Sequence, residues 1–151
     1  MDVVATLPVH PTKTYEARNL ADITTIVIHH TVSPDSRTAE QIAAYHVSSR
    51  GWPGIAYHYL IGADGAIEQT NYLDTISYHA AGGNNYSVGI ALKGDFTNIY
   101  PTDEQIAAAA WLVDWLQAQL SIEAVYGHRE AVGNATACPG DTWPEWKDRI
   151  V

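Results

Sequence analysis

The only cysteine of the chain, Cys138, lies ten residues beyond His128 in a segment that could bind a metal ion. His128 follows a short apolar run at 124–126, which predicts a strand. The loop at 129–140 contains glycine, asparagine and proline, so it must turn more than once and can return Cys138 to His128. Imidazole and thiolate together suit zinc. Two ligands do not complete a site, and the strongest candidate for a third is His29.

His29 ends a segment, 24–30, whose β-branched residues predict a buried strand. Side chains alternate along a strand, so His29 and His30 point to opposite faces and cannot both serve one site. A His, His, Cys set leaves the fourth zinc position for water, as in catalytic sites. Because zinc lowers the pKa of water and polarises a carbonyl, hydrolysis of an amide or ester is the natural reaction. The alternative is that Cys138 is a small buried hydrophobic residue and the histidines belong to the core or to loops.

Strands and helices alternate along the whole chain, 1–151, which predicts a single α/β domain with a mixed central sheet flanked by helices. Thr38 and Gln41 form a predicted capping box at the start of a helix that runs to about residue 49, and Gly51 predicts its end. The other expected elements are strands at 55–61, 66–69 and 86–92, helices at 102–120 and 143–150, and an irregular N-terminal arm at 1–22.

Acidic residues outnumber basic ones by 17 to 8, and the formal net charge is −9. This balance argues against nucleic acid or an anionic membrane as the main partner. One cysteine cannot form an internal disulfide, and no stretch is apolar enough to span a bilayer. Five Trp and nine Tyr residues against one Phe fit a groove for a polar, carbon-rich ligand such as a sugar, although core packing explains most of them.

Five blocks of sequence follow one another in an order that defines a known family. They read Ile-Val-Ile-His-His-Thr at 26–31, Gly-Trp-Pro-Gly-Ile-Ala-Tyr-His-Tyr-Leu-Ile at 51–61, His-Ala-Ala-Gly-Gly-Asn-Asn-Tyr-Ser-Val-Gly-Ile at 79–90, Gly-His-Arg at 127–129 and Thr-Ala-Cys-Pro-Gly at 136–140. With these blocks the chain resembles the type 2 N-acetylmuramoyl-L-alanine amidases, which include short phage endolysins and animal peptidoglycan recognition proteins. The resemblance covers about residues 22–148.

The resemblance implies one zinc ion per chain, held by His29, His128 and Cys138. It also implies hydrolysis of the amide between N-acetylmuramic acid and L-alanine in bacterial peptidoglycan. By the same resemblance Tyr57 assists at the attacking water, and Thr136 helps to hold the developing oxyanion. Because Thr136 offers only a neutral hydroxyl, oxyanion stabilisation would depend more on the metal.

Two positions separate subgroups of the family. Cytoplasmic recycling amidases of similar fold carry Glu in place of Ala91 and Asp in place of Cys138, so this chain resembles a lytic enzyme, an endolysin or autolysin. Relatives that bind peptidoglycan without cutting it typically lose the cysteine, which is present here. The alternative function is nevertheless such a non-catalytic recognition module, and a zinc hydrolase acting on another amide also stays open.

Three further residues are candidates for substrate binding. Trp52 follows the glycine that ends the first helix and could be a platform for a sugar or peptide. His79 opens a glycine-rich loop and could either contact substrate or stabilise that loop. Asn84 lies in the same loop. Among the other histidines, His46 faces the core or the rim of the groove, and His58 has a predicted packing role.

The N-terminal sequence has no basic stretch followed by a long apolar core, so it does not read as a signal peptide. We therefore expect a protein made in the cytoplasm that acts on the cell wall after release, or else a catalytic domain cut from a longer secreted protein. Peptidoglycan is the expected partner. We expect no insertion into a membrane, and we expect a monomer.

Overall fold

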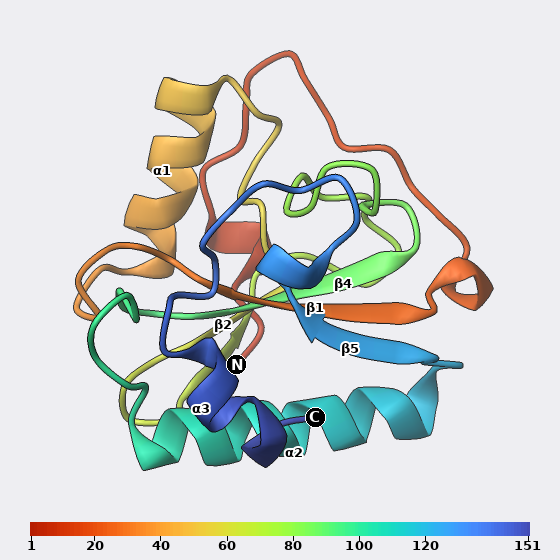
Figure 1. Cartoon of the computed structure of the whole chain (residues 1–151). Coiled ribbons are helices and arrows are strands. Elements are labelled where there is room, and N and C mark those ends of the chain that lie inside the picture. Colours follow the sequence, from red (N-terminus) through yellow and green to blue (C-terminus); the bar gives the residue numbers. More distant parts are fainter.

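A five-stranded sheet divides the molecule into two layers in the computed structural model, which describes residues 1–151 (Figure 1). The strands are β1 (Thr25–His30), β2 (Tyr59–Ile61), β3 (Ile67–Gln69), β4 (Ser87–Leu92) and β5 (Ala124–Gly127), in the order β3-β2-β4-β1-β5. The helices are α1 (Ala39–Arg50), α2 (Asp103–Gln119) and α3 (Trp143–Trp146), with 3-10 turns at Val4–Thr6, Leu20–Asp22, His128–Glu130 and Lys147–Arg149. Only the β2–β3 pair is antiparallel, so the predicted mixed sheet is confirmed.

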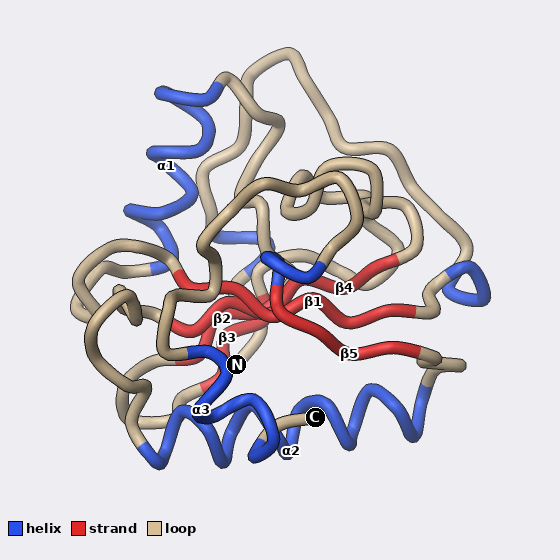
Figure 2. Tube along the Cα trace, in the orientation of Figure 1, coloured by secondary structure: helices blue, strands red, loops and turns tan.

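The two faces of the sheet differ in the size of their side chains. One face packs on α2 and α3 through a cluster of 17 buried residues. The other face lies under α1 and the long loops, as Figure 2 shows, and it has a cluster of only 6 buried residues. In β4 the large residues Val88, Ile90 and Leu92 belong to the first cluster, and the alternate residues are Ser87, Gly89 and Ala91. Small side chains on this face leave room for loops to pack directly on the strand.

Local signals set both ends of α1, as predicted, and the start of α2. The Thr38 hydroxyl accepts the N–H of Gln41 at 3.2 Å, and the Gln41 side chain accepts the N–H of Thr38 at 3.1 Å. At the other end Gly51 has φ +66°, a left-handed conformation that favours glycine. The helix α2 begins with the same capping box, made by Thr102 and Gln105.

The predicted C-terminal helix at 143–150 is instead the single turn α3 followed by a 3-10 turn. Trp143 and Trp146 are each 1% exposed, and their ring centroids lie 4.6 Å apart in an edge-to-face contact. Burying two large rings against the sheet fixes this segment more strongly than helix propensity does.

The segment before β2 departs from the predicted strand at 55–61, because side chains use its carbonyl groups. The Asn71 amide donates to the carbonyls of Ile55 and Tyr57, at 2.8 and 2.7 Å. Regular pairing is left to Tyr59–Ile61 alone. In a regular strand at 55–61, alternation would put Ile55, Tyr57 and Tyr59 on one face. That prediction is wrong: Tyr59 packs on the α2 side, whereas Ile55 and Tyr57 pack on the α1 side.

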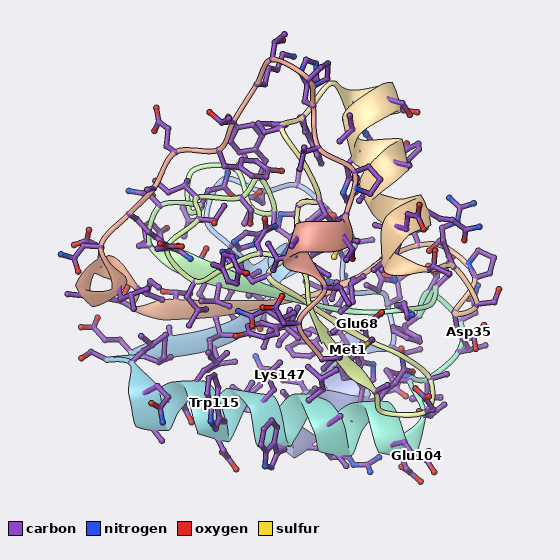
Figure 3. The ribbon with its side chains drawn as sticks, turned by 180° about the vertical axis from the view of Figure 1, so that it is seen from behind. Met1, Asp35, Glu68, Glu104, Trp115 and Lys147 are labelled. Carbon is purple, nitrogen blue, oxygen red and sulfur yellow. The ribbon has the colours of Figure 1, made fainter.

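The N-terminal segment crosses from β3 to the loops on the α1 side. Met1 lies beside Glu68 of β3 (Figure 3), and the N–H of Val3 continues this contact by donating to the Gln69 carbonyl. Further along, the Arg18 guanidinium donates to the carbonyls of Asn84 and Ser87 and to that of Leu73. Arg18 thus ties the segment to the loop that precedes β4. None of the helices is both long and apolar enough to cross a membrane.

Candidate metal centre and active site

The three predicted metal ligands meet where β1 and β5 end. His29 lies in β1, and His128 directly follows β5. The two strands are parallel neighbours, so their carboxyl ends lie at the same edge of the sheet. Cys138 returns on its loop, which is tied back where the N–H of Arg129 donates to the Cys138 carbonyl at 2.7 Å. One ligand atom from each of His29, His128 and Cys138 then lies within 4.8 Å of the other two.

The chemistry and spacing of this cluster fit zinc. His29 Nδ1 lies 3.5 Å from Cys138 Sγ, and a tetrahedral zinc ion with ordinary bond lengths separates nitrogen and sulfur ligands by about 3.6 Å. Burial keeps the pKa of His29 well below its ordinary value, so its imidazole is neutral and has a lone pair for a cation. Burial also raises the pKa of the Cys138 thiol to about 12, so a metal would have to displace the thiol proton.

Both histidines of the cluster are held by hydrogen bonds on the side away from Cys138. His29 Nε2 lies 3.0 Å from His79 Nδ1. His128 Nε2 lies 2.9 Å from Asn134 Oδ1, and Asn134 Nδ2 donates to the carbonyls of Ala81 and Val132. Because the Asn134 amide is oriented by those carbonyls, its oxygen faces His128, which leaves His128 Nδ1 free. Sequence reasoning did not single out Asn134, whose only signal was its place in the turning loop.

A cavity of about 540 Å³ opens beside the cluster. Its lining includes the predicted residues Tyr57, Trp52 and His79 together with His29, His128 and Cys138. The Tyr57 ring lies 5.3 Å from the His29 ring, centroid to centroid. The Tyr57 hydroxyl has no partner in the protein, and no buried polar side-chain atom is left unpaired, so this hydroxyl faces the cavity. Burial raises the pKa of the Tyr57 phenol above its ordinary value, which keeps it protonated.

Two of the predicted residues hold loops and do not line the cavity. Asn84 Oδ1 accepts the backbone N–H groups of His79 and Ala80, at 3.0 and 2.7 Å. The Thr136 hydroxyl accepts the N–H of Cys138 at 3.1 Å. Asn84 therefore shapes the loop that carries His79, and Thr136 shapes the loop that carries Cys138. Their predicted roles in substrate binding and at the oxyanion stay predictions.

His46 is a cavity residue that the sequence left undecided between core and rim. Its Nδ1 accepts the backbone N–H of Ala56 at 3.1 Å, so in the neutral ring Nε2 carries the proton. Nε2 has no partner in the protein and no unpaired polar atom is buried, so this N–H opens into the cavity. The sequence signal for this position was its spacing on α1: His46 follows Ile42 by one helical turn, and Ile42 is buried on the same side.

Buried neutral histidines predict a loss of stability in mild acid. Burial, assisted by Arg50, lowers the pKa of His46 from 6.5 to about 4, and burial lowers that of His58 from 6.5 to about 3. Between each lowered pKa and 6.5, the unfolded chain binds more protons than the folded chain. The free energy of unfolding is therefore greatest above pH 6.5 and falls as the pH drops. At pH 5 each histidine should lower the free energy of unfolding by about 2 kcal/mol relative to pH 7.

Denaturant unfolding of the chelator-treated protein between pH 7 and pH 5 measures this loss, in a range above the ordinary carboxylate pKa values. His46→Asn is the matched variant, because its amide oxygen can still accept the Ala56 N–H but the residue cannot be protonated. Between pH 7 and pH 5, the free energy of unfolding of this variant should fall by about 2 kcal/mol less than that of the wild type. Equal pH dependence in the two proteins would contradict the assignment of His46.

This sheet, with a His, His, Cys cluster at the ends of two parallel strands, defines a class of protein. The chain belongs to the N-acetylmuramoyl-L-alanine amidase family Amidase_2, whose family model matches residues 19–141. The family resemblance seen in the sequence is thus confirmed.

Similar proteins include both amidases and recognition proteins. The chain is 33% identical over 138 residues to peptidoglycan-recognition protein SC2 of Drosophila melanogaster, covering 80% of this chain and 74% of that one. Its fold is similar to that of the endolysin amidase LysCS from Clostridium intestinale, with a TM-score of 0.79, 30% identity, and coverage of 95% and 96% of the two chains. It is also similar to peptidoglycan recognition protein-LE in complex with tracheal cytotoxin, with a TM-score of 0.81, 26% identity, and coverage of 93% and 86%.

Proposed function

We propose that this protein is a zinc-dependent N-acetylmuramoyl-L-alanine amidase that cuts the bond between N-acetylmuramic acid and L-alanine in peptidoglycan. The observation that carries the proposal is the complete ligand set, His29, His128 and Cys138, at the wall of an open cavity. A recognition module needs only the cavity, whereas three ligands with an open fourth position are the arrangement of catalytic zinc.

The residues around the cluster support hydrolysis in defined roles. Zinc held by the three ligands would supply a Lewis acid for the amide carbonyl and would lower the pKa of the attacking water. The Tyr57 hydroxyl, open to the cavity and protonated, can orient that water or pass on its proton. The His46 Nε2–H can donate a hydrogen bond to substrate from the α1 side of the cavity.

The charge of the cavity supports a substrate that carries carboxylates. The chain has 17 acidic residues, and none of them lines the cavity. Of the 8 Lys and Arg residues, six donate hydrogen bonds within the protein through their side chains. The remaining two, Arg37 and Arg50, both line the cavity. The Arg50 guanidinium also lies over the rings of Tyr45 and Trp52, which holds it in place. Free guanidinium groups in a cavity without acids suit the carboxylates of a peptidoglycan stem peptide.

Replacing Arg50 by alanine should weaken substrate binding more than turnover. We expect KM for a soluble muramyl peptide to rise about tenfold with little change in kcat, because the guanidinium contacts substrate and transition state equally. Steady-state kinetics on the zinc-loaded protein measures both constants. Arg149→Ala is the matched control, since Arg149 pairs with Asp103 on α2, away from the cavity. Equal KM values in the two variants would show that Arg50 does not bind substrate.

Digestion of purified sacculi tests the proposed function directly. Mass spectrometry of the products should show new L-alanine amino termini and intact glycan chains with the zinc-loaded protein, and neither change after chelation. Binding to sacculi without new amino termini would instead support the recognition function. Amino termini other than those of L-alanine would show that the enzyme acts on a different amide.

A further inference from the structure

A chain of buried hydrogen bonds runs from the candidate metal centre into β4. His29 Nε2 lies 3.0 Å from His79 Nδ1. On its other side His79 Nε2 lies 3.2 Å from Ser87 Oγ and 3.3 Å from the Ser87 carbonyl. The Ser87 hydroxyl donates to the Gly83 carbonyl at 2.7 Å. His29, His79 and Ser87 are 1%, 6% and 0% exposed, so these bonds are largely shielded from water.

The partners at the far end of this series of hydrogen bonds decide where each proton lies. A serine hydroxyl has one proton, and that of Ser87 goes to the Gly83 carbonyl, so both Ser87 oxygens can only accept from His79. His79 Nε2 must therefore carry a proton, and Nδ1 of the neutral ring is an acceptor. His29 must then donate from Nε2, which leaves the lone pair on Nδ1, the atom 3.5 Å from Cys138 Sγ. Both imidazoles are buried and neither has a carboxylate partner, which favours the neutral rings.

We propose that His79, anchored by Ser87, is a positioning residue that fixes the tautomer and ring orientation of His29, so that Nδ1 is ready for the metal. The inference rests on the proposed zinc function and deepens it. Histidine ligands donate their second N–H to an outer partner that fixes the ring, and loss of such a partner typically lowers metal affinity by about 10–100-fold. Here the partner is a neutral imidazole that is almost fully buried.

The fold places His79 for this task in two ways. Asn84 Oδ1 accepts the backbone N–H groups of His79 and Ala80, which fixes the start of the loop. The His79 ring packs directly on the backbone of β4 at Gly89, where a Cβ atom would lie only 2.6 Å from His79 Cγ. Glycine at this position is therefore what allows His79 to reach His29.

The first test compares His79→Leu with His79→Asn in metal-free protein titrated with zinc against a competing chelator. Leucine fills the space without an acceptor, so zinc affinity should fall about 10–100-fold. The asparagine oxygen can take the place of Nδ1 and should restore most of the affinity. Ser77→Ala is the control, because Ser77 is equally buried but contacts His58, and it should bind zinc as the wild type does. Equal losses in the leucine and asparagine variants would mean that His79 only fills space, and would overturn the proposal.

The second test reads the tautomer of His29 by nitrogen-15 NMR of the metal-free wild-type protein, so it needs neither activity nor a variant that folds. We expect a slowly exchanging proton on His29 Nε2 and none on Nδ1; a proton on Nδ1 would overturn the proposal. In His79→Asn the Nε2 proton should remain, and in His79→Leu it should exchange rapidly. A wild-type protein that shows this tautomer but binds no zinc would refute the proposed function and leave the role of His79 intact.

Discussion

Cys138→Ala is expected to abolish both zinc binding and hydrolysis while leaving the fold in place. Without the thiolate only His29 and His128 remain, and two imidazoles do not hold a catalytic zinc ion. The metal contributes several kcal/mol to stabilisation of the transition state, so activity should fall on the order of 10³-fold or more. Cys138 belongs to neither hydrophobic cluster, so the thermal unfolding midpoint of the metal-free protein should change little.

Elemental analysis of protein purified without chelator, together with the rate of sacculus digestion, measures this effect. His30→Asn is the matched control. His30 is the chain neighbour of His29, but it faces the other side of β1, where its Nδ1 accepts the N–H of Phe96 at 3.1 Å. Asparagine can accept the same N–H, so this variant should keep zinc and activity. A zinc-free Cys138→Ala protein with full activity would exclude the proposed metal centre.

Tyr57→Phe is expected to lower kcat by about 10²–10⁴-fold, the usual contribution of a positioned proton-transfer group. The substitution removes only the hydroxyl, which faces the cavity without a protein partner. Because burial raises the pKa of this phenol, Tyr57 acts as a protonated hydroxyl that orients the attacking water or passes on its proton. Zinc content should not change, since Tyr57 is not a ligand.

Single-turnover kinetics on the zinc-loaded variant separates the chemical step from binding. Tyr59→Phe provides the comparison, because Tyr59 is two residues away but packs in the cluster on the α2 side. Its kcat should match that of the wild type. If Tyr57→Phe also turned over at the wild-type rate, the water would have to be oriented by another group of the cavity wall, and His46 would be the next to test.

Features that depend on neighbours in the chain could be predicted from the sequence. The capping boxes at Thr38 and Thr102 and the left-handed glycine that ends α1 involve residues a few positions apart, so their geometry is local. The strands β1 and β4 were predicted because continuous apolar runs mark buried parallel strands. The ligand set could be proposed because few side-chain types suit zinc and the chain has one cysteine.

The features that only the tertiary structure decided depend on contacts between residues that are far apart in the sequence. The side-chain amide of Asn71 donates hydrogen bonds to carbonyls of the segment before β2, so this segment is not a regular strand. Tyr57 therefore lies on the face opposite Tyr59, which alternation along a strand could not predict. His79 is 50 residues from His29, and its role became visible only when the loop packed on Gly89. Local sequence thus determined which elements form and which residues could bind zinc. The hydrogen-bond partners that orient those residues come from distant segments, because buried polar groups must find partners wherever the packed chain provides them.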